Sequence, residues 1–397
     1  AIANAIPATG KTNGFAAGNE AQAKSNQSIA IGYKSSASAA NPNAGQAELP
    51  ATAVGAGANA DGKAALALGL ASSATERGTA VGSSSKAAGF GSFAGGVGAQ
   101  AQGRGAVAIG GGSTATYNNT TGYVYNDNAA ATASDAVAIG TGAKAEESNA
   151  ISIGYHSNAK AGNSLAVGSN AAATGEGSVA VGRNNMASGA SAIAMGILAN
   201  ATGTSSTALG MQATASGNNT VAIGPSAKAV ADDSIAVGTN NTVAEKGVAI
   251  GKNVKAKAST YENMVVGIDS EASGAGGAMA VGMKVKTTGM DAVTVGRESQ
   301  ATGAWGVAVG RKANATGATS VALGTDVTAS GGNSAAMGSN ATSSGPGSLA
   351  IGSGTGNATT ALGANAIAMG TSSVAAASNA IAMGNGAVAN GADALRS

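Results

Sequence analysis

The chain has 397 residues, including 64 glycines and five prolines, and only 3% of its residues are aromatic. The 21 basic residues nearly balance the 19 acidic ones, so charge gives no argument for nucleic-acid binding, which needs a clustered basic surface. Cysteine is absent, which excludes disulfides and thiolate metal sites. The glycines recur with a long fixed period among aliphatic residues, which excludes a collagen-like or disordered chain.

The first part of the chain is regular apart from its start and one insertion. Residues 1–13 form a weakly patterned lead-in, after which glycines fit a common register at Gly18 and Gly32. An insertion then covers about residues 39–51. It contains two prolines, which cannot donate to a strand ladder, so we predict a loop that leaves the repeat.

A second insertion precedes a long regular stretch. This insertion covers about residues 114–128 and holds three of the six tyrosines. From Gly140 to Gly384 a glycine closes nearly every segment of fourteen residues, and we expect the two insertions to interrupt the repeat. The spacing departs from fourteen near Gly251 and Gly267, where the register slips. It departs again at Gly352, Gly363 and Gly370, which we interpret as a shortened coil.

One repeat contains two segments of alternating pattern. Residues 164–168 follow the pattern Ser-x-Ala-aliphatic-Gly, with aliphatic residues three and one positions before the glycine and alanine between them. Alanines three and five positions after the glycine form a second alternation, and alternation of period two predicts strands. Two tight turns leave no room for a helix, so we predict an all-β roll with two strands of four or five residues per coil. We count roughly 25 coils, which at a parallel stacking distance of about 4.8 Å per coil would give a rod on the order of 120 Å long.

The alternation also predicts which side chains face inward. We predict that Val and Ile fill the roll and that the alanine between them faces outward, as in Leu165, Ala166 and Val167. Such alanines would draw a continuous small apolar stripe along the molecule. An apolar stripe of that length would be an interaction surface, so we predict a homo-oligomer.

Candidate catalytic and metal-binding residues are few. His156 is the only histidine and follows a turn glycine, so we expect an exposed turn residue and leave its role open. The acidic pairs at residues 146–147 and 232–233 lack the further ligands that a calcium loop requires. We therefore predict no catalytic residue, no metal site and no cofactor.

Two groups of residues are candidates for ligand contact. Tyr117, Tyr123 and Tyr125 in the second insertion could form an aromatic patch, since tyrosine is enriched at binding hot spots, or could cover a break in the roll. Trp305 lies at a turn and could be an exposed anchor or a plug at the corner. The basic residues are densest between residues 246 and 312, where they could attract anionic polysaccharide. A solubilising exterior is the simpler interpretation. The residues are Lys246, Lys252, Lys255, Lys257, Lys284, Lys286, Arg297, Arg311 and Lys312.

The repeat resembles a known family. Residues 163–175 read Asn-Ser-Leu-Ala-Val-Gly-Ser-Asn-Ala-Ala-Ala-Thr-Gly, which is similar to the YadA-like head repeat of trimeric autotransporter adhesins, and the match recurs from about Gly14 to Gly391. Ala17 and Gly95 depart from the pattern, because the family has an aliphatic residue there. The resemblance implies a left-handed parallel β-roll, a parallel homotrimer and the outer-membrane surface of a Gram-negative bacterium. We expect one head domain over residues 14–397, with the membrane anchor outside this chain.

The resemblance implies a non-catalytic adhesin head that attaches by many weak contacts to matrix proteins, host cells or abiotic surfaces. A passive spacer rod that projects another binding domain is the alternative. An ice-binding face fits less well, because the threonines do not share one position in the repeat. An enzyme is the least consistent class, since no cluster of acids and bases lies at one position of the repeat.

Overall fold

The structure is a computed structural model in which each of two compact units, residues 1–205 and 206–397, is a parallel β-solenoid. Fourteen-residue coils recur through both units and give about 25 turns in all. The lead-in lies almost wholly outside the described residues, and so does most of the first insertion. The described residues are 13–39, 49–111, 115–118, 122–125, 129–257, 262–354 and 357–396.

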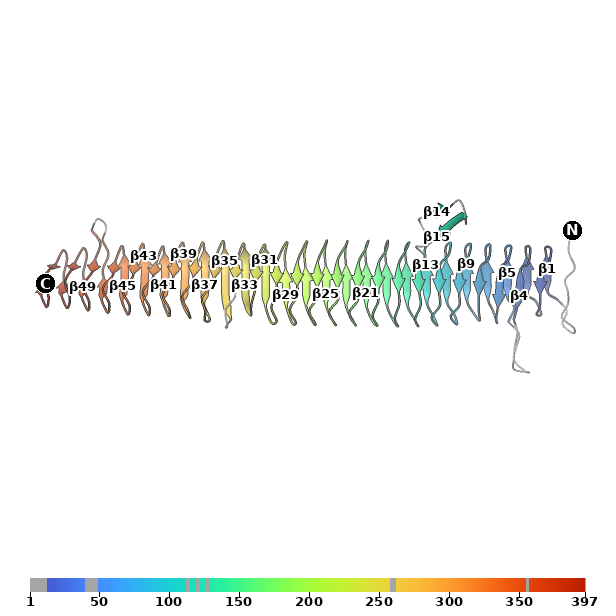
Figure 1. The fold of residues 1–397 in the computed structure, drawn as a ribbon, viewed down its shortest axis with the longest axis horizontal. Coiled ribbons are helices and arrows are strands. Elements are labelled where there is room, and N and C mark those ends of the chain that lie inside the picture. Colours follow the sequence, from blue (N-terminus) through green and yellow to red (C-terminus); the bar gives the residue numbers. More distant parts are fainter. Residues whose placement is uncertain are drawn as a thin grey trace. The chain divides into compact units, whose positions relative to one another are not determined.

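In the first unit, every complete coil contributes one strand to each of two parallel sheets (Figure 1). The aliphatic sheet contains the strands that precede the closing glycine: β1 (Phe15–Ala17), β3 (Ile29–Ile31), β5 (Thr52–Val54), β7 (Leu66–Leu68), β9 (Thr79–Val81), β11 (Phe93–Gly95), β13 (Val107–Ile109), β17 (Val137–Ile139), β19 (Ile151–Ile153), β21 (Leu165–Val167), β23 (Val179–Val181) and β25 (Ile193–Met195). The polar sheet contains the strands that follow it: β2 (Gln22–Ala23), β4 (Ser36–Ser38), β6 (Asn59–Asp61), β8 (Ser73–Ala74), β10 (Lys86–Ala87), β12 (Gln100–Ala101), β16 (Ala130–Ala131), β18 (Lys144–Ala145), β20 (Asn158–Ala159), β22 (Ala172–Ala173), β24 (Met186–Ala187) and β26 (Asn200–Ala201).

The second unit has the same two sheets. Its aliphatic sheet contains β27 (Thr207–Leu209), β29 (Val221–Ile223), β31 (Ile235–Thr239), β33 (Gly247–Lys252), β35 (Asn263–Ile268), β37 (Met279–Met283), β39 (Val293–Arg297), β41 (Val307–Arg311), β43 (Val321–Thr325), β45 (Ala335–Ser339), β47 (Leu349–Ile351), β49 (Ile367–Met369), β51 (Ile381–Met383) and β53 (Leu395–Arg396). Its polar sheet contains β28 (Thr214–Ala215), β30 (Lys228–Ala229), β32 (Thr242–Val243), β34 (Lys255–Ala256), β36 (Glu271–Ala272), β38 (Lys286–Thr287), β40 (Gln300–Ala301), β42 (Asn314–Ala315), β44 (Thr328–Ala329), β46 (Thr342–Ser343), β48 (Thr360–Ala361), β50 (Val374–Ala375) and β52 (Val388–Ala389).

Parallel stacking of the coils is confirmed, but most strands are shorter than predicted. Most coils of the first unit have three residues in the aliphatic strand and two in the polar strand, instead of four or five. The aliphatic strands from β31 to β45 are longer, with five or six residues each. The same part of the chain buries larger side chains in the interior, such as Val254, Val265 and Val285.

The predicted sidedness of the coil is wrong. Ala166 is fully buried, whereas Leu165 and Val167 on either side of it are only half-buried and face outward. Ala171 and Ala173 of the same coil are also fully buried, so alanine faces alanine inside the roll. In most coils the two sheets, which are joined by tight turns, lie too close for valine or isoleucine to fit between them. The interior of these coils is filled mainly by alanine and serine, and the aliphatic residues cover the outside of one sheet. A few coils of the second unit bury a valine instead, such as Val243, Val265 or Val327.

The closing glycines are required by both conformation and stacking. Gly168 has a φ of 127°, and a Cβ on it would lie 2.1 Å from the carbonyl oxygen of Gly182 in the next coil. Turn asparagines are also explained by conformation, because Asn170 and Asn184 have φ values of 54° and 53°, which asparagine tolerates better than most residues. The Asn170 side chain donates to the Asn184 side chain at 3.0 Å, so these residues form a ladder along the stack.

The buried serine that opens the pentad has a defined role. The Ser164 hydroxyl donates to the carbonyl oxygen of Ala161 at 2.6 Å, and the Ser92 hydroxyl donates to that of Gly89 at 2.7 Å. The backbone N–H groups of the same serines also donate to these two carbonyls, at 3.3 Å and 3.2 Å. The hydroxyl therefore adds a second, shorter hydrogen bond that reinforces the turn before the aliphatic strand.

The insertions leave the strand ladder intact, contrary to the prediction that they interrupt the roll. Ile31 of β3 pairs with Val54 of β5, and Ile109 of β13 pairs with Ile139 of β17, directly across the inserted residues. The second insertion forms its own antiparallel hairpin of β14 (Ala115–Asn118) and β15 (Gly122–Tyr125), which Figure 1 shows beside the stack.

The coil predicted to be shortened is lengthened instead. Gly352 stacks directly beneath Gly370, because a Cβ on Gly352 would lie 2.3 Å from the carbonyl oxygen of Gly370. Gly363 belongs to the opposite turn, where it stacks on Gly345. The coils around Gly251 and Gly267 differ in length from the regular coil, as the change of spacing in the sequence indicated. The two glycines nevertheless pair with each other in register.

Candidate interaction surfaces

The outer side of the aliphatic sheet presents two rows of apolar side chains in each unit. In the first unit, Ile109 and Met195 are 40% and 43% exposed, and in the second unit Ile250 and Met383 are 41% and 46% exposed. The rows repeat at most coils because most strands of this sheet have aliphatic residues on both sides of a buried alanine. A contiguous apolar surface of this kind is typical of a protein interaction site.

Two departures from the pattern are compensated within their own strands. Gly95 lacks a side chain, and the ring of Phe93 covers the place that a side chain of residue 95 would occupy. A Cβ on Gly95 would lie 2.9 Å from Phe93 Cε1. The first coil combines the same residue types, with Phe15 in the position of Phe93 and Ala17 in the position of Gly95. A large aromatic residue thus accompanies each missing aliphatic one, and the apolar rows continue.

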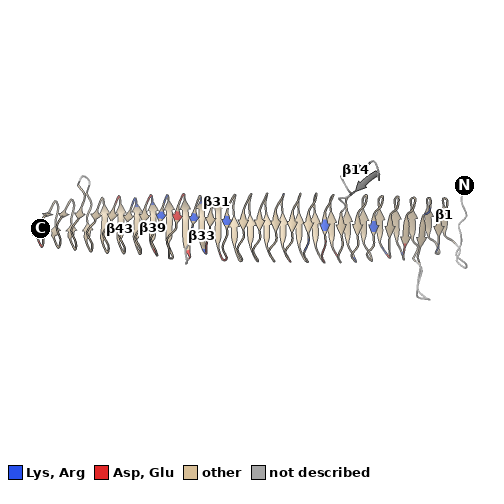
Figure 2. Ribbon diagram, in the orientation of Figure 1, with Lys and Arg blue, Asp and Glu red and all other residues tan. Residues whose placement is uncertain are grey.

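The outer side of the polar sheet has a different character. Its strands expose Lys, Asn, Gln, Thr or Ser next to a buried alanine in most coils, as in Lys144 and Asn158. In the second unit, β30, β34 and β38 each begin with a lysine and β36 begins with Glu271. Figure 2 shows blue segments and a red one close together in this part of the chain, near the labels of β31 and β33. Each unit therefore has one apolar and one polar side.

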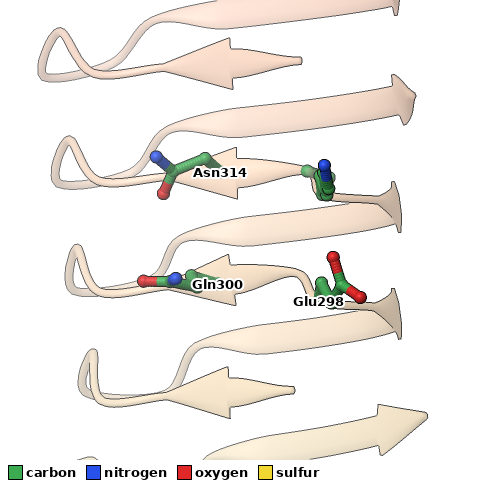
Figure 3. Close-up of a pocket in the computed structure, with 5 residues that line it drawn as sticks. Glu298, Gln300 and Asn314 are labelled. Carbon is green, nitrogen blue, oxygen red and sulfur yellow. The ribbon is translucent and has the colours of Figure 1, made fainter. Parts of the chain in front are cut away.

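The polar side of the second unit is hollowed at two places. One hollow of about 380 Å³ is lined by Asn240, Asn253, Lys255, Asp269, Ser270 and Glu271. Another of about 350 Å³ lies between two successive coils, where Glu298 and Lys312 come from the turns and Gln300 and Asn314 from the strands (Figure 3). Both hollows are open, and most of their lining side chains can donate or accept hydrogen bonds.

The tyrosines and the tryptophan chosen from the sequence lie in separate units. In the hairpin, Tyr117 pairs in register with Tyr123, and Tyr125 pairs with Ala115. Trp305 is 53% exposed at a turn with a φ of 54°, so it is exposed and does not plug the corner. A residue other than glycine costs about 1–2 kcal/mol in this conformation, and the exposed indole adds a further cost.

His156 is half-buried, whereas the sequence predicted an exposed residue. Its ring packs edge-on against Tyr155 with centroids 4.1 Å apart, and its Nδ1 lies over Gly142 of the preceding coil. Among the described residues, no group of three or more His, Cys, Asp or Glu side chains is arranged to hold a metal ion.

The sequence analysis missed one exposed aromatic cluster. Phe90 is 41% exposed, with the guanidinium carbons of Arg77 and Arg104 at 5.1 Å and 5.8 Å from its ring centroid. These residues come from the same turn of three successive coils. Each residue lies eight positions after the closing glycine that precedes it, so counting residues from that glycine would have aligned all three.

A comparison with protein families gives matches to the YadA head domain repeat over most of the chain. The chain belongs to the YadA head family. The matched residues are 10–41, 50–72, 101–121, 131–157, 159–185, 187–213, 215–241, 301–326, 329–355 and 361–387. A comparison with curated proteins gave no match.

Membership of the YadA head family makes this chain a structural adhesin-type domain of a cell-surface autotransporter. The matched segments omit residues 242–300. These residues contain the irregular coils around Gly251 and Gly267 and the lysines of β34 and β38. Within the described residues, no helix is long and apolar enough to cross a membrane.

Proposed function

We propose that this YadA-like head acts as a parallel homotrimer of left-handed rolls, which attaches a Gram-negative cell to matrix proteins, host cells or other surfaces without catalysis. Its place would be the outer membrane surface, and the two units would belong to one head domain. The observation that carries the proposal is the pair of half-exposed aliphatic rows on one sheet of each unit, which an assembly of copies would bury.

The energy available from these rows supports an assembly. Burying an aliphatic side chain completely contributes about 1.5–3 kcal/mol, and the rows are already half-buried, so each residue would add about 1 kcal/mol. The rows continue along each unit, and the contributions would accumulate over many coils. In a single roll the same rows would remain in contact with water, while the interior offers mainly alanine and serine contacts.

The assembly is tested by charge substitution on one sheet of the same coils. We expect the double variant Ile153→Lys, Val167→Lys to lose the trimer, because it places charges in the aliphatic rows of β19 and β21. Asn158→Lys with Ala172→Lys is the matched control, since it adds the same charge to the polar sheet. Analytical ultracentrifugation at micromolar concentration measures the outcome. A wild-type protein that sediments as a monomer would refute the trimer.

Adhesion itself is tested by binding to immobilised collagen, laminin and fibronectin. We propose the hairpin tyrosines and Trp305 as contact residues, so Tyr117→Ala, Tyr123→Ala and Tyr125→Ala together should weaken binding to the recognised protein about tenfold. Trp305→Ala is assayed separately because it lies in the other unit. Unchanged binding by all of these variants would exclude these residues as contacts.

A spacer role is the second candidate. Strand pairing that continues directly across both insertions favours it, because the coils then form an unbroken scaffold within the first unit. In a spacer, removal of whole coils changes only reach, whereas in an adhesin some coils carry contacts.

A further inference from the structure

The polar side of the second unit contains four lysines that form no ion pair within the described part of that unit. Lys228, Lys255 and Lys286 are exposed on β30, β34 and β38, and Lys284 lies on the turn before β38. Each polar strand from β30 to β38 pairs with the next one. The three strand lysines therefore follow one another at intervals of two coils, or about 10 Å.

The carboxylates beside these lysines are engaged by other partners. Glu271 pairs with Lys257 at 2.8 Å, and Glu298 lies 3.3 Å from Arg297. The Asp269 carboxylate accepts a hydrogen bond from Asn253 at 2.9 Å. The acids are therefore partly neutralised by groups outside the lysine row, which leaves an excess of positive charge on this side.

The hydrogen-bonding groups around the row suit hydroxyl-rich ligands. The hollow beside Lys255 presents the amides of Asn240 and Asn253, and the hollow beyond β38 presents the amides of Gln300 and Asn314. Both hollows are open along the sheet, which suits a chain that lies across several coils. Within the described coils from β30 to β42, the outward positions of the polar strands carry Lys, Thr, Glu, Gln or Asn and none is aromatic, so this side offers no platform for stacking nucleic-acid bases.

We propose that the lysine row, defined as Lys228, Lys255, Lys284 and Lys286, binds a linear anionic polysaccharide that lies along the stacking direction of the second unit. The ammonium groups pair with sulfate or carboxylate groups of successive sugars, and the amide-lined hollows receive sugar hydroxyls. Single exposed ion pairs contribute at most about 1 kcal/mol, so affinity comes from several pairs on one polymer.

This inference deepens the proposed function and rests on it, because an assembly that buries the aliphatic sheets leaves the polar sheets facing outward. It names the class of partner that one surface of the adhesin recognises. Its location is also the part of the second unit that departs from the regular repeat, within the unmatched residues 242–300 and the coil before them.

The test compares two variants that remove equal charge. Lys228→Gln, Lys255→Gln and Lys286→Gln are changed together, and the control changes Lys86→Gln, Lys144→Gln and Lys160→Gln in the first unit. Binding of the full chain to immobilised heparin, hyaluronan and neutral dextran is measured by surface plasmon resonance. Heparin tests recognition of sulfate, and hyaluronan tests recognition of carboxylate alone.

We expect the wild-type protein to bind heparin or hyaluronan but not dextran, with an affinity that falls as salt is added. The variant of the lysine row should bind at least tenfold more weakly, and the control should change less than twofold. Equal losses in both variants, or no binding of either charged polymer by the wild-type protein, would overturn the inference. Sedimentation of the same samples separates the two proposals, because a trimer that binds no polysaccharide contradicts only the lysine row. Circular dichroism confirms that each variant is folded.

Discussion

Alanine at the centre of each aliphatic strand determines how closely the two sheets approach. Ala166 and Ala173 are both fully buried in one coil, and the same positions are alanine in most other coils. Interior space of this size has no room for additional methylene groups. In a coil of this size, the substitution tolerated least is therefore a larger side chain at the alanine position, whereas the longer coil of β35 accommodates Val265 there.

We predict that Ala166→Leu destabilises the protein by about 3 kcal/mol or more, because overpacking of a closed interior forces the two sheets apart. Val167→Leu, one residue away on the outer side, should change stability by less than about 0.5 kcal/mol. Thermal unfolding followed by circular dichroism measures both variants. Equal effects would mean that the interior is not as tightly closed as the structure shows.

A second prediction concerns the compensation between Phe93 and Gly95. Gly95→Val should destabilise the protein by about 1–2 kcal/mol, since the new Cβ approaches the Phe93 ring at 2.9 Å. The double variant Phe93→Val, Gly95→Val restores the arrangement of Val179 and Val181 in β23, so it should recover most of the loss. A double-mutant cycle on unfolding free energies measures the coupling, and strictly additive effects would contradict the compensation.

The sequence was sufficient to predict the period, the parallel stacking and the two strands of each coil, because the spacing of the glycines constrains all three. It was not sufficient to predict which side chains face inward. Leu165 and Val167 form one alternating set and Ala166 belongs to the other, and both sets are apolar, so hydrophobicity does not distinguish inside from outside. The distance between the two sheets decides which set faces inward, and the tight turns set that distance.

The candidate contact residues were chosen from the sequence only because they are aromatic. Their role in binding stays a prediction.

At the scale of elements, insertions occur at turns and leave the strand ladder unchanged. β13 and β17 pair over all three of their residues although β14, β15 and β16 lie between them in the sequence. Removing residues 113–128 would leave Gly110 and Gly140 fourteen positions apart, which is the regular coil length. The hairpin is thus an addition to a complete coil.

We predict that deletion of residues 113–128 leaves the β-sheet circular-dichroism signal intact and changes the melting temperature by only about 2 °C, since no strand pair of the two sheets is lost. Deletion of residues 169–175 is the control. It removes half a coil, so each following aliphatic strand would meet the polar sheet and each following polar strand would meet the aliphatic sheet. This deletion should therefore unfold the surrounding coils. A large loss of stability on removing the hairpin would show that it supports the stack.

At the scale of the whole molecule, the two proposals assign different functions to the two sides of the coil. We propose the aliphatic side as the surface for copies of the same chain and the polar side of the second unit as the surface for a polysaccharide. The coils are similar enough that whole ones can be removed without changing this division, because each coil contacts mainly its neighbours.

Deletion of residues 169–182, one complete coil, should therefore give a folded protein with unchanged oligomeric state. In the adhesin proposal, adhesion to the recognised matrix protein persists, because the hairpin, Trp305 and the lysine row all remain. Further deletion of the hairpin or of the coils with the lysine row should then reduce adhesion. Adhesion that depends only on the number of coils, and not on which are removed, would favour the spacer.

The direct pairing of β13 with β17 has a consequence for how such a protein changes over time. A turn that admits a peptide without disturbing its neighbours is a graft point, where foreign segments can be exchanged while the scaffold stays the same. Antigenic variation can then be confined to one exposed site, and a chosen epitope placed between residues 112 and 129 should be displayed without redesign of any coil.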